Sequence, residues 1–187
     1  PTDDVWVATV VNSPIAWWFA WRNAMHGKDE ALRFIRQFVR TIPIPAVPDG
    51  RRGAVHDAVQ RLVAIANASN IAESAIIDWL RIEHGIDKPG NKLSDAQSLN
   101  SDDFVEEVKK RRGKKNALSV AALKMVRDEY AKTIAPLIQM SDAAKVLENQ
   151  LSDCVNEAFG LTHDEIDLMW KTAPPRMPIP RPPAPQG

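Results

Sequence analysis

The proline-rich segment Thr41–Gly50 is the feature that most constrains the fold of this chain. It contains Pro43, Pro45 and Pro48 and ends in the turn sequence Pro-Asp-Gly. Proline removes a backbone donor and clashes with the preceding helical turn, and it cannot donate to a β-ladder. Neither a helix interior nor a central strand accommodates such a segment. The sequence therefore predicts a boundary near residue 48, with residues 1–48 as one part and residues 49–172 as another.

Helical patterns dominate the chain after this boundary. Caps, glycine stops and apolar stripes predict six helices. The first three are Gly53 to about Ala68, Ile71 to His84, which is either separate from the first or fused to it, and Ser101 to Arg112. The next begins at Ser119 and kinks or ends at Pro136, another begins at a Ser141 cap and ends at Gly160, and the last begins with a Thr162–Glu165 capping box and reaches Lys171. The stripe of the Ser119 helix is Val120, Leu123, Val126, Tyr130, Ile134, Leu137 and Ile138. The expected fold class is mainly α, a helical bundle or hairpin module with a small N-terminal β element and a Pro-rich C-terminal tail.

The segment before the boundary gives mixed signals. Val5–Val11 is apolar and β-branched, which predicts a short buried strand. Asn12-Ser13-Pro14 then predicts a turn, a helix N-cap and a proline at the first helical position. On that helix Pro14, Trp17, Trp18, Trp21 and Met25 share one face, which favours packing over stacking on nucleic-acid bases. Asp29–Val39 satisfies neither the helical nor the strand period cleanly, and both alternatives stay open.

The net charge is zero, with 24 basic and 24 acidic residues, but the charges are segregated along the chain. Residues 109–127 hold eight Lys or Arg and no acid, whereas residues 141–169 hold seven acids against Lys145. A neutral total can therefore hide local fields that attract phosphate.

Two basic segments are the candidate DNA-binding sites. The first follows the tryptophan-rich helix, and the second is a run at the end of a predicted helix. Their members are Arg22, Lys28, Arg33, Arg36, Arg40, Arg51 and Arg52 in the first, and Lys109, Lys110, Arg111, Arg112, Lys114 and Lys115 in the second. Cations that neutralise phosphates release counterions, and Arg matches guanine edges. The alternative for both segments is an ordinary solvated surface, including cations that interact with the last carbonyls of a helix.

Composition narrows the remaining classes of protein and kinds of site. The chain has 187 residues, 44% of them apolar, enough for one core or a core with a satellite. The lone Cys154 and the scattered histidines predict neither an internal disulfide nor a zinc site, and a reducing cytoplasm fits. We expect no membrane span and no signal peptide, since neither pattern occurs in the sequence. The residues 173–187 predict a polyproline II tail, either a strap laid against the body, a disordered end, or a docking peptide for a partner.

Four segments, in this order, resemble a known family: Asn12–Pro45, Asp78–Ser94, Phe104–Lys124 and Ala158–Pro180. The first is similar to the stretch of TaqI-like and type IIG restriction-modification methylases in which an Asn-Ser-initiated helix leads through a basic segment to an Ile-Pro-Ile-Pro exit. The last is similar to the end of such polypeptides. The resemblance covers most of the chain and implies the C-terminal target-recognition and helical accessory region of an adenine-specific DNA methyltransferase.

The resemblance implies duplex DNA and the upstream methyltransferase domain of the same polypeptide as partners. Such a methylase needs a glycine-rich turn for S-adenosylmethionine and an Asn-Pro-Pro-aromatic loop for the flipped adenine. Neither motif occurs between residues 1 and 187. We therefore expect no catalytic residues and no cofactor in this piece, with S-adenosylmethionine bound by the missing catalytic domain. The rival interpretation is a helical protein-interaction module that links the methylase to a partner subunit.

Overall fold

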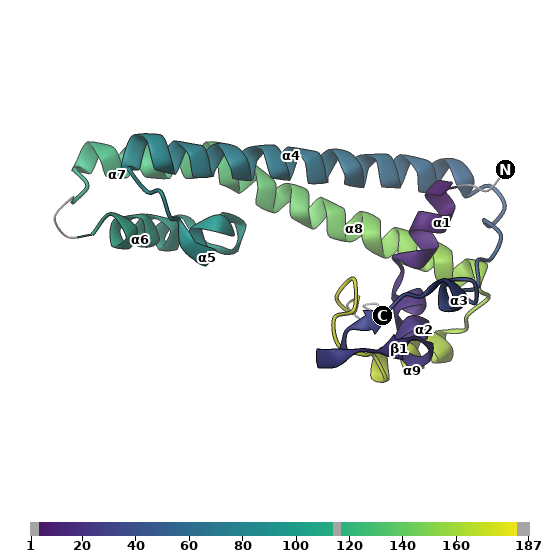
Figure 1. The fold of residues 1–187 in the computed structure, drawn as a ribbon. Helices are drawn as coiled ribbons and strands as arrows, with labels where there is room; N and C mark the ends of the chain where they lie inside the picture. The colour runs from purple at the N-terminus through teal and green to yellow at the C-terminus, as the bar shows by residue number, and fades with distance from the viewer. Residues whose placement is uncertain (1–3, 114–116, 183–187) are drawn as a thin grey trace. The chain divides into compact units, whose positions relative to one another are not determined.

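The computed structural model describes residues 4–113 and 117–182. The chain is mainly α-helical with one small sheet (Figure 1). The helices are α1 (Asp4–Val11), α2 (Pro14–Asn23), α3 (Arg36–Val39), α4 (Arg52–His84), α5 (Gly90–Ser94), α6 (Ser101–Arg112), α7 (Val120–Glu129), α8 (Ala135–Ala158) and α9 (His163–Lys171), and the strands are β1 (Met25–His26) and β2 (Leu32–Arg33). The predicted fold class is confirmed.

Two compact units make up the chain. Unit 1 contains residues 1–61 and 145–187, and unit 2 contains residues 62–144. Helices α4 and α8 each contribute residues to both units. The functional division at residues 48 and 172 stays a prediction.

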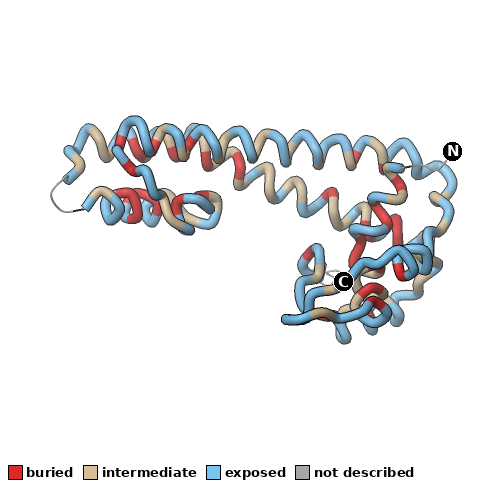
Figure 2. Tube along the Cα trace, in the orientation of Figure 1, coloured by how far each residue is buried: buried red, intermediate tan, exposed pale blue. Residues whose placement is uncertain are grey.

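Unit 2 is built around one apolar cluster. The cluster combines side chains of α4, α5, α6 and α7, of the turn Tyr130–Ile134 and of the start of α8. Its large, fully buried members are Ile76, Leu80, Leu93, Phe104, Val105, Val108, Val126 and Ile134. Buried and exposed positions alternate around α6, as an amphipathic helix requires (Figure 2). Gly113, at φ 75°, ends α6, and Ser119 caps α7 through the backbone N–H of Ala122, both as predicted. The two predicted helices 53–68 and 71–84 are fused into α4.

Pro136 does not end the helix that contains it. A π-helical turn, Tyr130–Ile134, comes between α7 and α8, and α8 then runs through Pro136 to Ala158. A proline clashes with the carbonyl four residues earlier, and a widened turn at that point relieves the clash. The predicted cap at Ser141 is wrong, because Ser141 lies inside α8. Val120 is also not inward, with 85% of its surface exposed.

The predicted strand Val5–Val11 is wrong, because these residues belong to helix α1. The buried residues of α1 are Trp6, Thr9 and Val10, a helical spacing of three and four. Trp6 donates its indole N–H to the carbonyl of Pro45 at 2.7 Å, and it packs with Val55 and Val155. Tertiary packing thus overrides the β-propensity of the valines.

Helix α2 begins as the sequence predicts. The Ser13 side chain accepts from the backbone N–H of Ala16, and Pro14 occupies the first turn. Its deepest positions are Pro14, Ala16 and Ala20, while the three tryptophans are half-buried. The predicted packing face is therefore confirmed in part, and its last member, Met25, is 57% exposed.

The C-terminal tail is a strap against unit 1 over its described residues. Pro174 and Ile179 are buried, and Arg181 pairs with Asp167 at 2.9 Å. The expected continuous polyproline II conformation is wrong. A turn occurs at Pro175–Arg176, where Arg176 has φ 60°.

Candidate nucleic-acid interface

The first basic segment forms a short hairpin followed by a single helical turn. Strands β1 and β2 are antiparallel, with Met25 opposite Arg33 and His26 opposite Leu32. At the tip, Asp29 and Glu30 have φ of 57° and 59°, a left-handed conformation that costs energy for residues other than glycine. Asp29–Val39 is therefore neither one helix nor one strand, which explains why both periods fail there.

Helix α3 is held in unit 1 by Phe38. This side chain is buried and stacks on Phe19 of α2, with ring centroids 6.2 Å apart. Burying an aromatic ring is worth a few kcal/mol, enough to anchor one helical turn. The anchor leaves Arg36 and Arg40, four residues apart, on the exposed side.

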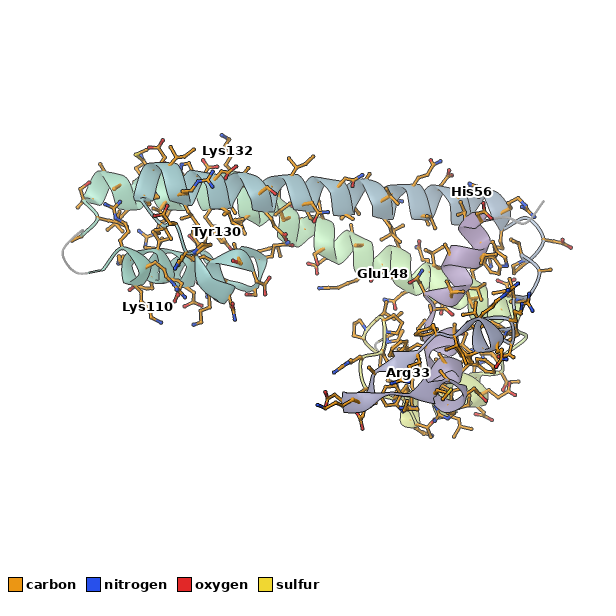
Figure 3. The ribbon with its side chains drawn as sticks, viewed as in Figure 1. Arg33, His56, Lys110, Tyr130, Lys132 and Glu148 are labelled. Atoms are coloured by element: carbon orange, nitrogen blue, oxygen red, sulfur yellow. The ribbon has the colours of Figure 1, made fainter. Side chains whose placement is uncertain are left out.

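Four predicted DNA-binding residues of this segment are exposed cations: Lys28, Arg33, Arg36 and Arg40. Lys28 is at the hairpin tip. Arg33 is on β2 (Figure 3). Among the described residues, no ion pair engages any of these four side chains. Their charge is therefore available to an anionic ligand, and we name them the hairpin cations.

Apolar residues lie between and beside the hairpin cations. Phe34, Ile35 and Val39 are 52%, 40% and 48% exposed. A cavity of about 320 Å³ is lined by Val11, Ala16, Trp17, Ala20, Phe34, Val39 and Ile42. The sequence indicated no binding role for Phe34 and Val39. The sequence signal for these two residues is that residues 29–39 follow neither the helical nor the strand period. Apolar residues with neither period do not all face one packed side, so some of them are expected at the surface.

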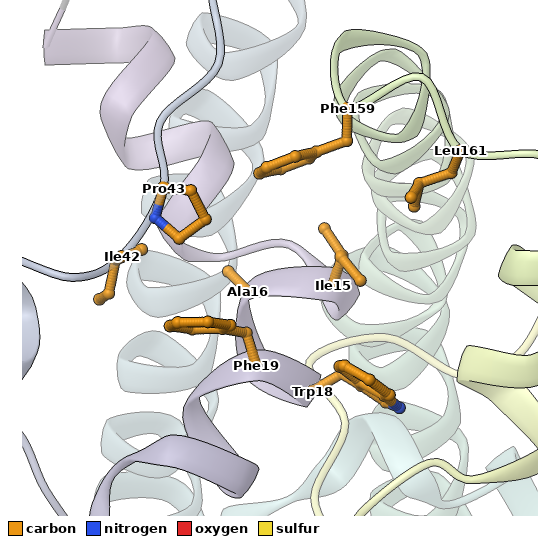
Figure 4. A pocket seen from close by; sticks show the side chains of 8 residues that line it. All are labelled: Ile15, Ala16, Trp18, Phe19, Ile42, Pro43, Phe159 and Leu161. Atoms are coloured by element: carbon orange, nitrogen blue, oxygen red, sulfur yellow. The ribbon is translucent and has the colours of Figure 1, made fainter.

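A second apolar cavity of unit 1 is shown in Figure 4. It has a volume of about 190 Å³ and is lined by Ile15, Ala16, Trp18, Phe19, Ile42, Pro43, Phe159 and Leu161. No charged side chain lines it, so it suits apolar groups only.

The other predicted cations of unit 1 have structural partners or stand apart from the hairpin. Arg22 stacks on Trp18, 3.7 Å from the ring centroid, and donates to the carbonyl of Thr172 at 3.0 Å. Arg51 pairs with Glu157 at 3.1 Å. Arg52 is exposed at the first residue of α4. Arg22 is thus tied into unit 1 and is a poor candidate for DNA contact, whereas the Arg51 pair is exposed on both sides and holds Arg51 only weakly.

The predicted run 109–115 is not a cluster of unpaired cations where the structure describes it. Lys109 lies 2.7 Å from Glu106, while Lys110 and Arg111 lie 3.7 and 3.0 Å from Glu107. Lys110 projects outward from α6 (Figure 3). The Lys109–Glu106 pair is exposed on both sides, and such a pair contributes about 0.2–0.5 kcal/mol, so Lys109 can exchange partners at low cost. Lys110 is itself 72% exposed and lies at the longer distance from Glu107. Lys114 and Lys115 lie outside the described residues.

Arg111 and Arg112 are held more firmly than the two lysines. The Glu107 side chain is only 6% exposed, so Arg111 compensates a buried carboxylate. Arg112 places Nη1 3.0 Å from Nδ1 of His84. Because a guanidinium can only donate, Nδ1 must accept, and neutral His84 carries its proton on Nε2. Burial, followed by the nearby charge of Arg112, lowers the pKa of His84.

Two further classes of site receive no support from the described residues. No group of His, Cys, Asp and Glu side chains among them has an arrangement suited to a metal ion. In the same part of the chain, no helix has the length and apolar character needed to cross a lipid bilayer.

Fold and surface together define a mainly helical protein with an exposed hairpin of cations and apolar residues. The chain belongs to the family described as "Domain of unknown function (DUF8810)", which it matches over residues 48–155. Neither a curated protein nor a solved structure matches it.

Proposed function

We propose that this chain is the target-recognition and helical accessory region of a restriction-modification DNA (adenine-N6) methyltransferase, non-catalytic by itself. In this proposal the hairpin cations contact the phosphates of duplex DNA, and an upstream domain binds S-adenosylmethionine and transfers the methyl group. The resemblance in four ordered segments supports the family assignment. The observation that carries the DNA contact is the set of hairpin cations, which are exposed and form no ion pair within residues 4–113 and 117–182.

The proposed interface is narrower than the set of basic residues in the sequence. A cation contacts a phosphate at low cost only if it gives up little interaction energy with groups of the protein itself. Lys28, Arg33, Arg36 and Arg40 meet this condition, whereas Arg22, Arg111 and Arg112 do not. Lys109 and Lys110 take a secondary role, because each must first leave a carboxylate.

The test compares two sets of substitutions in the full chain. One variant carries Arg33→Ala, Arg36→Ala and Arg40→Ala, and its matched control carries Lys109→Ala and Lys110→Ala. We expect the first to flatten the dependence of log affinity on log salt by about 0.9 for each phosphate that the variant no longer neutralises. The control should change the slope of log affinity against log salt only slightly. Equal effects of both variants would place the DNA-binding surface elsewhere, and fluorescence anisotropy with a labelled duplex measures the difference.

The second candidate function is the protein-interaction module. The apolar cavity beside α3 and the exposed Phe34, Ile35 and Val39 favour it, because contiguous exposed apolar residues mark protein interfaces. Duplex titrations of the unsubstituted chain and of the variant with Phe34→Ser and Val39→Ser separate the two functions. Under the DNA proposal both chains bind duplex with the same salt slope. Under the interaction module neither chain binds duplex, even at low salt.

A further inference from the structure

Helix α3 and the cavity beside it form an apolar surface that is bordered by cations. The cavity of about 320 Å³ is lined in part by Phe34 and Val39, which are 52% and 48% exposed. Arg36 and Arg40, at the start and at the C-cap of α3, are exposed and form no ion pair within residues 4–113 and 117–182. This surface therefore suits an apolar side chain that has negative charges beside it.

Helix α9 has the opposite pattern. Leu168 is 56% exposed on this helix, and Asp164 and Asp167 precede it by four residues and by one. Both carboxylates are exposed, and in the described part of the chain Asp164 forms no ion pair, while Asp167 has only the exposed pair with Arg181. Such a pair is worth little, so Asp167 can exchange its partner at low cost. Helix α9 therefore presents an apolar side chain flanked by negative charges.

The charges of the two surfaces are also spaced alike. Arg36 and Arg40 are four residues apart, and the two aspartates of α9 are three residues apart. Either separation places helical side chains about 5–6 Å from each other. Two cations can therefore meet two carboxylates while Leu168 enters the cavity. Complementary charge of this kind fixes the register of an interface and repels wrong partners.

Helix α2 contacts both surfaces within unit 1. Trp17 lines the cavity and donates its indole N–H to the carbonyl of Pro175, in the strap that follows α9, at 3.0 Å. Trp18 donates to the hydroxyl of Thr172 at 3.0 Å, and that hydroxyl donates to the carbonyl of Leu168 at 2.8 Å. One region of the chain thus carries both halves of a complementary pair. A twofold-symmetric interface between identical chains requires this arrangement, because each copy contributes the same surface.

We propose that this chain self-associates through these two surfaces, with Leu168 of each copy in the cavity of the other. Arg36 and Arg40 of one copy pair with the two α9 aspartates of the second copy, and the same contacts recur across the twofold axis. The proposal does not rest on DNA binding, although duplex DNA and a second copy compete for the same cations.

Charge reversal in the full chain tests the proposal, with self-association measured by sedimentation equilibrium in the absence of DNA. The cation variant carries Arg36→Glu and Arg40→Glu, and the acid variant carries Asp164→Lys and Asp167→Lys. We expect the unsubstituted chain to form dimers. Each variant should raise the dimer dissociation constant roughly tenfold or more, because like charges then face each other. An unsubstituted chain that stays monomeric up to about 1 mM would overturn the proposal.

Mixing the two variants separates a lost contact from a folding defect. In the mixture the introduced carboxylates of one chain face the introduced amines of the other, and the natural charges face each other as before. We expect heterodimers with a dissociation constant within about threefold of that of the unsubstituted chain. Variants that are folded by circular dichroism but stay monomeric when mixed would overturn the proposal.

Two further variants test the location of the interface. Leu168→Ser keeps every charge and removes the apolar group from the cavity, so it should raise the dissociation constant about tenfold. The matched control reverses two exposed cations of unit 2, through Lys124→Glu and Lys132→Glu, and should leave the dissociation constant unchanged. An unchanged constant for Leu168→Ser, or equal weakening by the control and the cation variant, would contradict this interface.

Discussion

The guanidinium carbon of Arg22 lies 3.7 Å from the centroid of the Trp18 ring. This stacking, with the hydrogen bond to Thr172, makes Arg22 part of the structure of unit 1. We expect Arg22→Ala to lower the free energy of unfolding by about 1–2 kcal/mol, the combined value of a cation–π contact and a hydrogen bond. Thermal unfolding measures this decrease. An unchanged stability combined with a flatter salt dependence of DNA binding would instead make Arg22 a phosphate contact.

His84 predicts a pH dependence of stability. Its folded-state pKa is lowered from the ordinary value of 6.5, so folding favours the neutral ring. The contribution of neutral His84 to the free energy of unfolding is complete above pH 6.5. It is lost as the pH falls below 6.5 and through the lowered pKa of the folded state. We expect the difference in unfolding free energy between the natural chain and His84→Gln to shrink as the pH falls from about 7 to 5. Denaturant titrations at several pH values measure it, and a difference independent of pH would contradict the prediction.

Gly90 is required by its backbone conformation, and a side chain there would also displace Arg111. It has φ 69°, and a Cβ at this position would meet the guanidinium of Arg111, which pairs with the buried Glu107. We expect Gly90→Ala to destabilise the chain by about 1–3 kcal/mol. Gly53 in α4 is the matched control, because no atom lies within 4 Å of a Cβ there. Gly53→Ala should be neutral or stabilise by about 0.5 kcal/mol, and equal effects in chemical denaturation would contradict the argument.

Helix ends were predictable from the sequence because capping is local. Ser13, Ser119 and the Thr162–Glu165 box lie where the sequence places them. The strand expected at Val5–Val11 failed because the decisive contact is distant, namely Trp6 with Pro45. Ser141 failed as a cap because a π-helical turn accommodates Pro136 and lets α8 continue through it.

The candidate site was predictable as a list of cations but only partly as a surface. Glu106 and Glu107 precede Lys109, Lys110 and Arg111 by three or four residues, and this spacing already indicates pairs on one helix. The pairing of Arg112 with His84 joins residues 28 positions apart, and no local pattern indicates it. Which cations stay unpaired is therefore a property of the folded chain.

The salt dependence of duplex binding by the unsubstituted chain tests the proposed interface most directly. If Lys28, Arg33, Arg36 and Arg40 all contact phosphates, log affinity should fall with log salt concentration at a slope of about −3.6, from about −0.9 for each contact. A slope near zero, or no binding to duplex DNA at low salt, would contradict the proposed DNA contact.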